Sequence, residues 1–166
     1  MQIERVTPEP SAVVAVELAD ILIDCVEGGA SVGFLTTVTR EEALHFWQQT
    51  LAADATIPLV ARSDGIVGVV QLKLAGQPNG VHRADVAKLL VRRSARGQGV
   101  AGALLTHLET AARESGRSLL VLDTETGSDA ELLYLRLGWS RAGVIPCYAA
   151  TPDGTLIATT VMYKQL

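Results

Sequence analysis

The stretch Lys88-Leu-Leu-Val-Arg-Arg-Ser-Ala-Arg-Gly-Gln-Gly-Val-Ala-Gly-Ala-Leu-Leu-Thr-His-Leu108 contains the features from which the rest of the fold can be worked out. Its apolar beginning, Leu89 to Val91, predicts the end of a strand. From Val100 onward, apolar residues recur at the i, i+3 and i+4 spacing of one helix face. The residues between are basic and rich in glycine. The stretch therefore predicts a strand, a glycine turn and a helix that ends near Gly116.

The glycine turn predicts an anion-binding site. The first backbone N–H groups of a helix have no partner within the helix, and they lie at the positive end of its dipole, which is equivalent to about half a charge. Gly97 and Gly99 have no side chain to keep an anion away from these groups. Arg92, Arg93 and Arg96 add positive charge beside the turn. We therefore expect a ligand that carries phosphate.

The composition excludes several classes of protein. A chain of 166 residues is long enough for one domain with a substantial core. Its net charge of −4 argues against a general affinity for nucleic acid or for an anionic membrane. Cys25 and Cys147 imply no disulfide framework, and their spacing to the histidines matches no metal motif. Without a signal peptide or an apolar run of ~18 residues, the protein is expected to be cytoplasmic.

The remaining elements follow from local patterns. The capping box Thr39-Arg40-Glu41-Glu42 starts a helix that runs to about Ala53. Asp64-Gly65 predicts a hairpin turn. The continuous apolar run 118–124 predicts a central strand that is buried on both faces. The expected strands are 2–6, 58–62, 66–74, 86–91, 118–124, 142–149 and 156–164, and the other helices are 11–26, 100–115 and 129–137.

This order, β-α-α-β-β-β-α-β-α-β-β, indicates a single α/β domain that covers residues 1–166. The hairpins would supply the antiparallel part of a mixed sheet.

The glycine turn also matches the dinucleotide-binding pattern G-x-G-x-x-G over 97–102, and Asp123 follows about twenty residues later, where a ribose-binding acid is expected. Two observations argue against this interpretation. Residues 92–96 separate the strand from the first glycine, and only one clear β-α unit follows residue 97 before the terminal hairpin.

A second interpretation takes Arg96-Gly-Gln-Gly-Val-Ala101 as R-x-x-G-x-A, which resembles the coenzyme A pyrophosphate motif of the GCN5-related N-acetyltransferases (GNAT family). The strand five residues before Arg96 and the long helix after the turn fit the same family. Residues 130–139 resemble its A-x-x-x-Y-x-x-x-G-F segment, with Trp139 as the aromatic residue. The resemblance covers the whole chain and implies the GNAT fold.

A group within this family, the tabtoxin resistance proteins, shows a closer resemblance. Its members acetylate a small β-lactam amino acid. The segments that carry the resemblance are 28–34, 78–80, 94–97, 122–125 and 150–154. It makes a small amine the expected acceptor and toxin or antibiotic resistance an expected role. A homodimer is an expectation at the level of the family.

The family resemblance implies an acetyl-CoA-dependent N-acetyltransferase and a set of residues that bind acetyl-CoA. The pyrophosphate would bind backbone N–H groups of the turn, and the pantetheine would pair like an added strand along Leu89 to Val91. The N–H group of Leu89 or its neighbour could then polarise the acetyl carbonyl. The expected cofactor-binding residues are Leu89, Leu90, Val91, Arg96, Gly97, Gln98, Gly99, Val100, Ala101 and Gly102.

Catalysis needs a neutral amine, and an alkyl amine with a pKa near 10.4 is neutral only about once in 10³ at pH 7, which costs ~4–5 kcal/mol. The resemblance implies two candidate bases, Asp85 and Asp123. Strand alternation puts Asp85 on one face with Leu89, about 13 Å away, so that it would act through water. Asp123 ends the next strand, where it could instead cap a turn. Lys88 is expected to face away from Asp85, in a salt bridge or at the rim.

Tyr134 aligns with the tyrosine that often donates a proton to the leaving thiolate in the family. A strong hydrogen bond to the thiolate is the more defensible role, because transfer from a phenol near pKa 10 to a thiolate near 8.5 is uphill by ~2 kcal/mol. The alternative role is that of a core aromatic residue.

Two other functions stay open. The chain could acetylate a protein or peptide, or it could be a non-catalytic acyl-CoA sensor. A peptide acceptor needs a groove that is open at both ends, so a loop 28–37 that roofs the acceptor site would argue against it.

Overall fold

Seven strands form one sheet in the order β1-β2-β3-β4-β5-β7-β6 in the computed structural model, which describes residues 1–7 and 12–166. All neighbouring strands are antiparallel except β4 and β5, so the predicted mixed sheet and element order are confirmed. The strands are β1 (Gln2–Arg5), β2 (Thr56–Arg62), β3 (Ile66–Leu74), β4 (Arg83–Val91), β5 (Leu119–Glu125), β6 (Ser140–Ala150) and β7 (Leu156–Gln165). The helices are α1 (Ala12–Glu27), α2 (Arg40–Leu51), α3 (Val100–Glu114) and α4 (Asp129–Arg136), with short 3-10 turns at Pro78–Gly80 and Arg93–Ala95.

The predicted helix 11–26 begins with Ser11, which lies outside the described residues. Strand β4 begins at Arg83, three residues before its predicted start. In the described ranges, no helix combines the length and the apolar character that crossing a bilayer requires.

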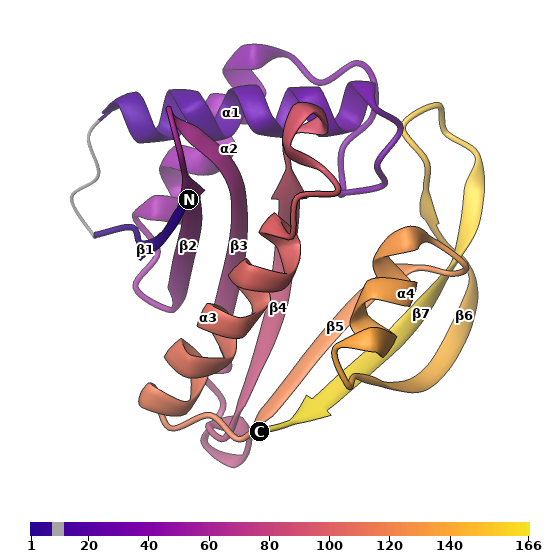
Figure 1. Cartoon of the computed structure of the whole chain (residues 1–166). Helices are drawn as coiled ribbons and strands as arrows, with labels where there is room; N and C mark the ends of the chain where they lie inside the picture. The colour runs from indigo at the N-terminus through magenta and orange to yellow at the C-terminus, as the bar shows by residue number, and fades with distance from the viewer. Residues whose placement is uncertain (8–11) are drawn as a thin grey trace.

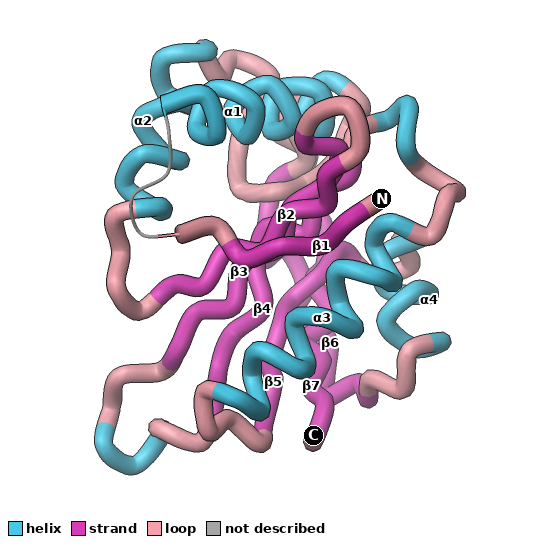
Figure 2. The backbone as a smooth tube through the Cα atoms, turned by 60° about the vertical axis from the view of Figure 1, so that its left-hand side comes forward, coloured by secondary structure: helices cyan, strands magenta, loops and turns pink. Residues whose placement is uncertain are grey.

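Helices cover both faces of the sheet (Figure 2). Helices α1 and α2 lie on one face, where Leu22 and Trp47 pack with Val69 of β3. Helices α3 and α4 lie on the other face, where Leu104 packs in the same core as Leu72 of β3. Each core takes its own set of side chains from β3, because successive residues of a strand point to opposite faces.

The prediction that β5 is buried on both faces is wrong. Leu120 and Leu122 are buried, whereas Leu119 and Val121 are only half-buried. Leu120 and Leu122 belong to the core under α3 and α4. The opposite face of β5 is more open because α1 and α2 pack mainly over β2, β3 and β4.

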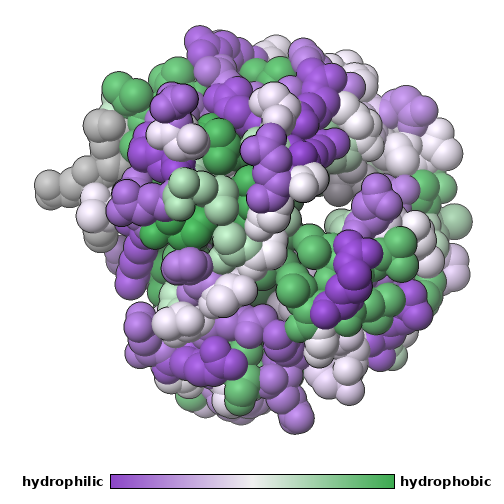
Figure 3. All heavy atoms as spheres, in the orientation of Figure 1, coloured by the Kyte–Doolittle hydropathy of each residue, from purple (hydrophilic) through white to green (hydrophobic). Residues whose placement is uncertain are grey.

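Strands β4 and β5 pair only over a short distance and then separate (Figure 1). The paired residues are Arg83 to Asp85 with Leu119 to Val121. Beyond Val121, β5 continues to pair with β7, so it does not follow β4. The space-filling view shows an open gap at this place, between the part that carries β4 and α3 and the part that carries β5 and α4 (Figure 3).

A bulge interrupts β4 at Lys88. Val69 pairs with Leu90 and Gln71 pairs with Ala87, so Lys88 and Leu89 together stand against one residue of β3. Lys88 has a φ of 52°, in the left-handed region. The extra residue reverses the alternation of the strand. Leu90 consequently packs in the core under α1 and α2, although Val86, four residues earlier, packs under α3.

Candidate functional site

The turn before α3 leaves a row of backbone N–H groups free. Gly97 and Gly99 have φ angles of 74° and 80°, and Gly99 caps α3 without a side-chain hydrogen bond. Ala103 donates the first helical hydrogen bond, to the carbonyl of Gly99. Within the described part of the chain, the N–H groups of 97–102 have no backbone or side-chain acceptor. A Cβ added at Gly97, Gly99 or Gly102 would meet no atom within 4 Å, so a ligand can reach these groups.

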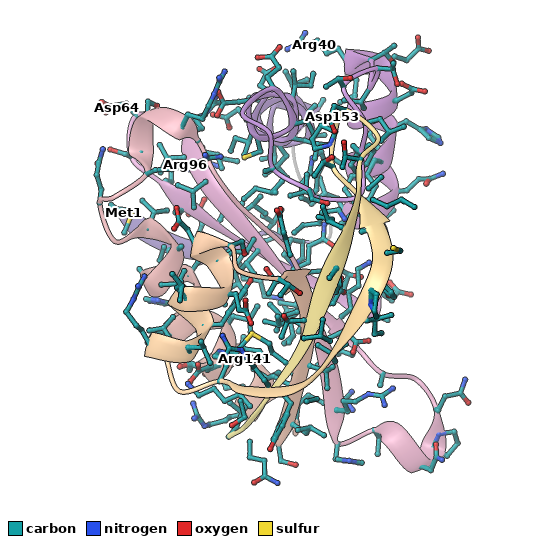
Figure 4. The ribbon with its side chains drawn as sticks, turned by 90° about the vertical axis from the view of Figure 1, so that its right-hand side faces the viewer. Met1, Arg40, Asp64, Arg96, Arg141 and Asp153 are labelled. Atoms are coloured by element: carbon teal, nitrogen blue, oxygen red, sulfur yellow. The ribbon has the colours of Figure 1, made fainter. Side chains whose placement is uncertain are left out.

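The arginines beside the turn bind protein groups in this structure. Arg92 donates to the carbonyl of Ile66 at 2.9 Å, and Arg93 pairs with Asp24 at 2.8 Å. Arg96 extends beneath α1, where Nε donates to the carbonyl of Val91 at 3.3 Å and Nη2 lies 3.8 Å from the sulfur of Cys25 (Figure 4). These contacts fasten the turn to α1 and β3. The backbone N–H groups of 97–102 remain available to an anion.

The gap has one wall on β4 and the other on β5. Beyond Asp85, the described residues of β4 pair only with β3, so the edge from Leu89 to Val91 faces the gap without a strand partner. Asp123 is exposed on β5 and pairs through its backbone with Val161. The structure therefore brings the predicted pantetheine edge opposite Asp123, with the glycine turn at the end of the same β4 edge.

Asp85 occupies a different place from the one predicted. It is exposed and lies where β4 and β5 are still paired, opposite Val121. The prediction that it shares a face with Leu89 is wrong, because the bulge at Lys88 reverses the alternation between them. Its catalytic role stays a prediction that the geometry does not favour.

Tyr134 is buried in the core under α3 and α4, within electrostatic range of the Asp123 carboxylate. Its side chain is 6% exposed, and its ring packs edge-on to Trp139, with 5.5 Å between the centroids. Burial raises the pKa of the Tyr134 phenol, and the carboxylate of Asp123 raises this pKa further. Tyr134 therefore stays protonated and can donate a hydrogen bond, which is the role that the sequence favours over proton transfer.

A buried carboxylate that is not among the residues predicted from the sequence holds the loop between β5 and α4. Glu131 is 2% exposed and accepts hydrogen bonds from the Gly127 N–H at 2.6 Å and from Arg141 Nε at 2.7 Å. Arg141 comes from β6 and reaches α4 from below (Figure 4). Ser128 caps α4 by accepting from the Glu131 N–H at 3.2 Å. The spacing Ser-x-x-Glu is that of a capping box, so the sequence contains a signal for Ser128 and Glu131. It contains no local signal for Arg141.

We expect Glu131→Gln to lower the free energy of unfolding at pH 7 by about 1–3 kcal/mol, because buried hydrogen bonds to a charged group are lost. The Gly127 N–H and then Arg141 lower the pKa of Glu131. A carboxyl with a lowered pKa stabilises the fold above its unfolded pKa of about 4.3, and this contribution disappears as the pH falls through the folded value. Urea unfolding curves of the two proteins should therefore converge in acid. Asp129→Asn, an exposed change on the same helix, is the control, and a difference independent of pH would contradict a role for the charge.

Lys88 lies in a different place from the predicted salt bridge or rim position. It is half-buried, and its Nζ lies 5.4 Å and 5.8 Å from the ring centroids of Phe46 and Phe34. The two rings pack edge-on with 5.2 Å between centroids. Strand alternation alone gives the wrong direction for this side chain, because nothing in the local pattern marks the bulge.

The loop between α1 and α2 is tied to the β6–β7 hairpin above the gap (Figure 1). Ser31 Oγ donates to the carbonyl of Ala150 at 3.0 Å, and the Thr36 N–H donates to the carbonyl of Pro152 at 3.0 Å. Phe34, between these two contacts, reaches the ammonium of Lys88. The loop therefore forms a roof over the end of the gap where Lys88 lies.

Comparison with known proteins identifies relatives. The model of the acetyltransferase (GNAT) family matches residues 17–139. The N-acetyltransferase 8F1 of Rattus norvegicus is 28% identical over 134 residues, which are 80% of this chain and 61% of the relative. An uncharacterized N-acetyltransferase of the hisH-hisA intergenic region of Azospirillum brasilense is 32% identical over 110 residues, 64% of this chain and 66% of the relative. The chain thus spans about three fifths to two thirds of the length of these relatives.

Solved structures share the fold over nearly the whole chain. Ribosomal-protein-alanine N-acetyltransferase from Brucella melitensis has a TM-score of 0.82 at 24% identity, with 100% of both chains covered. The acetyltransferase yncA of Salmonella typhimurium, solved with its cofactor acetyl-CoA, has a TM-score of 0.79 at 20% identity over 100% of this chain and 94% of its own. Aminoglycoside 6'-acetyltransferase type Ii has a TM-score of 0.76 at 19% identity over 99% and 97%. At these identities the likeness concerns the fold alone.

Proposed function

Since the chain belongs to the GNAT acetyltransferase family, we propose that it transfers an acetyl group from acetyl-CoA to the amine of a small molecule. The observation that carries the proposal is the row of free N–H groups at 97–102, which stands at one end of an unpaired strand edge. A roofed acceptor end adjoins the other end of that edge.

The residues around the gap fit acetyl-CoA. Its pyrophosphate matches the free N–H groups at the positive end of α3, and Gly97, Gly99 and Gly102 leave the approach open. The amide groups of its pantetheine match the unpaired edge from Leu89 to Val91. When bound there, acetyl-CoA supplies an activated acetyl thioester. The structure of yncA with acetyl-CoA, a protein of the same fold, supports this proposal.

The roof favours a small acceptor over a peptide. The contacts of Ser31 and Thr36 with the hairpin close the acceptor end from above, whereas a peptide needs a groove that is open at both ends. Proteins of this fold include a ribosomal-protein-alanine acetyltransferase and an aminoglycoside acetyltransferase, so the fold itself does not decide between the two kinds of acceptor. Acetylation of an amino-acid-like toxin, as in the tabtoxin resistance proteins, is the finer form of this proposal.

Asp123 and Tyr134 are assigned the catalytic roles. Asp123 is exposed to the gap and can take the proton of the attacking amine, directly or through water. Tyr134 stays protonated and donates a hydrogen bond that stabilises the thiolate when the C–S bond breaks. Asp85 is the weaker candidate, because it lies at the closed end of the gap.

Release of free thiol from acetyl-CoA, measured with a panel of small amines, tests the proposed function. The panel contains amino acids, including β-lactam amino acids, and aminoglycosides, and an N-terminal peptide serves as the competing substrate. We expect thiol release that depends on a small amine. Binding of acetyl-CoA without turnover on any amine would indicate a sensor, and turnover on the peptide alone would indicate a protein acetyltransferase. A cytoplasmic location and a homodimer stay predictions.

A further inference from the structure

Lys88 presents an ammonium group at the acceptor end of the gap. Its side chain is half-buried, and no described residue accepts a hydrogen bond from Nζ or forms an ion pair with it. The group stands beside the rings of Phe34 and Phe46, at 5.8 Å and 5.4 Å from their centroids. Aromatic rings stabilise a cation but accept no full hydrogen bond from it. The donor capacity of Nζ is therefore available to a ligand.

The position of this ammonium follows from the bulge and the roof. The bulge turns Lys88 toward α2 and the roof, immediately before the edge that is proposed to bind pantetheine. A Cβ added at Gly33 in the roof would stand 3.4 Å from Nζ, so the loop comes close to the ammonium. An acceptor in reach of the thioester end of the pantetheine is thus also in reach of Lys88.

The opposite wall of the gap carries the opposite charge. Burial lowers the pKa of Lys88, the charge of Lys73 lowers it further, and the carboxylate of Asp123 counteracts both. Asp123 is therefore within electrostatic range of Lys88 but forms no ion pair with it. A cation on β4 and an anion on β5, held apart by the gap, match a molecule that carries both charges.

We infer that Lys88 binds a carboxylate of the acceptor, so that the substrate is an amine that also carries a carboxylate, as an amino acid does. The inference rests on the proposed function and specifies its substrate class. The ammonium of such a substrate would face Asp123. Its carboxylate would accept the hydrogen bond for which Lys88 Nζ has no partner among the described residues. A hydrogen bond between two charged groups is about twice as strong as a neutral one, so Lys88 would set specificity.

The test compares L-amino acids with their primary amides as acceptors, because the amide lacks the negative charge of the carboxylate. The two are compared at equal concentrations of the neutral amine, since the amide also lowers the pKa of the amine. We expect wild-type kcat/KM to be at least about tenfold higher for the acids. Lys88→Met should remove this preference by lowering kcat/KM for the acids while kcat/KM for the amides is unchanged. The dissociation constant of acetyl-CoA should also be unchanged. Lys88→Arg should retain the preference in part. Arg83→Met, an exposed change at the other end of the same strand, should retain it fully.

A binding measurement gives the same comparison without turnover. In the presence of CoA, N-acetyl amino acids should bind the wild-type protein more tightly than N-acetyl amino acid amides, and Lys88→Met should abolish the difference. Circular dichroism and thermal unfolding check that Lys88→Met is folded, and removal of a half-buried charge is expected to raise its Tm.

The outcomes separate the inference from the proposed function. If wild-type protein acetylates the amides as well as the acids, or if Lys88→Met weakens both equally, the proposed function stands and the inference fails. If no small amine is acetylated and the peptide is, the proposed function fails and the inference falls with it.

Discussion

Replacing Gly102 with leucine is expected to raise the dissociation constant of acetyl-CoA by about 100-fold or more. Gly102 lies in the first turn of α3, and a Cβ placed there points into open space beside the free N–H groups. A leucine side chain would occupy the space through which a pyrophosphate reaches those groups. Losing two hydrogen bonds to a charged ligand, at about 1.5–3 kcal/mol each, would raise the dissociation constant by at least this factor. Titration calorimetry with acetyl-CoA measures it.

The same substitution should not harm the fold. Gly102 does not have a positive φ, and leucine favours a helix over glycine by about 0.5–1 kcal/mol. The variant should therefore be at least as stable as the wild type, which separates loss of binding from loss of structure. Thr106→Leu, one turn further along the exposed side of α3, is the matched control. S-acetyl-pantetheine, which lacks the pyrophosphate, should be used equally well by both variants. Normal acetyl-CoA binding by Gly102→Leu would refute the assignment of the turn.

Replacing Asp123 with asparagine is expected to lower kcat at pH 7 by about 10²-fold, the usual contribution of a general base. Asp123 is exposed on the β5 wall of the gap, where its carboxylate acts on both Lys88 and Tyr134. Asparagine has nearly the same shape but cannot accept a proton. Affinity for acetyl-CoA should be unchanged, because the turn at 97–102 is untouched.

The pH dependence of the Asp123→Asn variant distinguishes two roles. If Asp123 takes the proton of the amine, the loss in kcat should shrink as the pH rises toward the pKa of the amine used, where the neutral form predominates and no longer needs a base. If Asp123 only positions the acceptor, the loss should be the same at every pH. Asp64→Asn, at the exposed β2–β3 turn far from the gap, controls for the change in charge. Asp85→Asn is the comparison, and a larger loss for it would make Asp85 the base.

Local patterns in the sequence were sufficient for most elements of the fold. Thr39 and Glu42 form the predicted capping box, with the Thr39 N–H donating to Glu42 Oε2 at 2.7 Å and the Glu42 N–H to Thr39 Oγ1 at 3.2 Å. Gly99 starts α3 in the left-handed conformation that a glycine turn predicts. These features depend on neighbours within a few residues, so the sequence contains all that determines them.

The two predictions that were wrong, on β4 and on β5, concern features that depend on tertiary contacts. The alternation that put Asp85 with Leu89 assumes a regular strand, and the bulge at Lys88 is visible only in the register between β3 and β4. The apolar run of β5 predicts burial on both faces, yet the extent of α1 and α2 over the sheet leaves one face half-buried. In both cases the outcome depends on a segment distant in the chain.

The sequence by itself determined the element order and the glycine turn at 97–102, because capping, glycine conformation and apolar periodicity act over one or two turns of chain. Only the tertiary structure decided that β4 and β5 separate after Asp85 and that the α1–α2 loop is tied to the β6–β7 hairpin. It also placed Lys88 beside the rings of Phe34 and Phe46, opposite Asp123. The physical reason is that strand register, the reach of a helix layer and the partners of a half-buried charge are set by side chains that lie far apart in the sequence and meet only when the sheet is assembled.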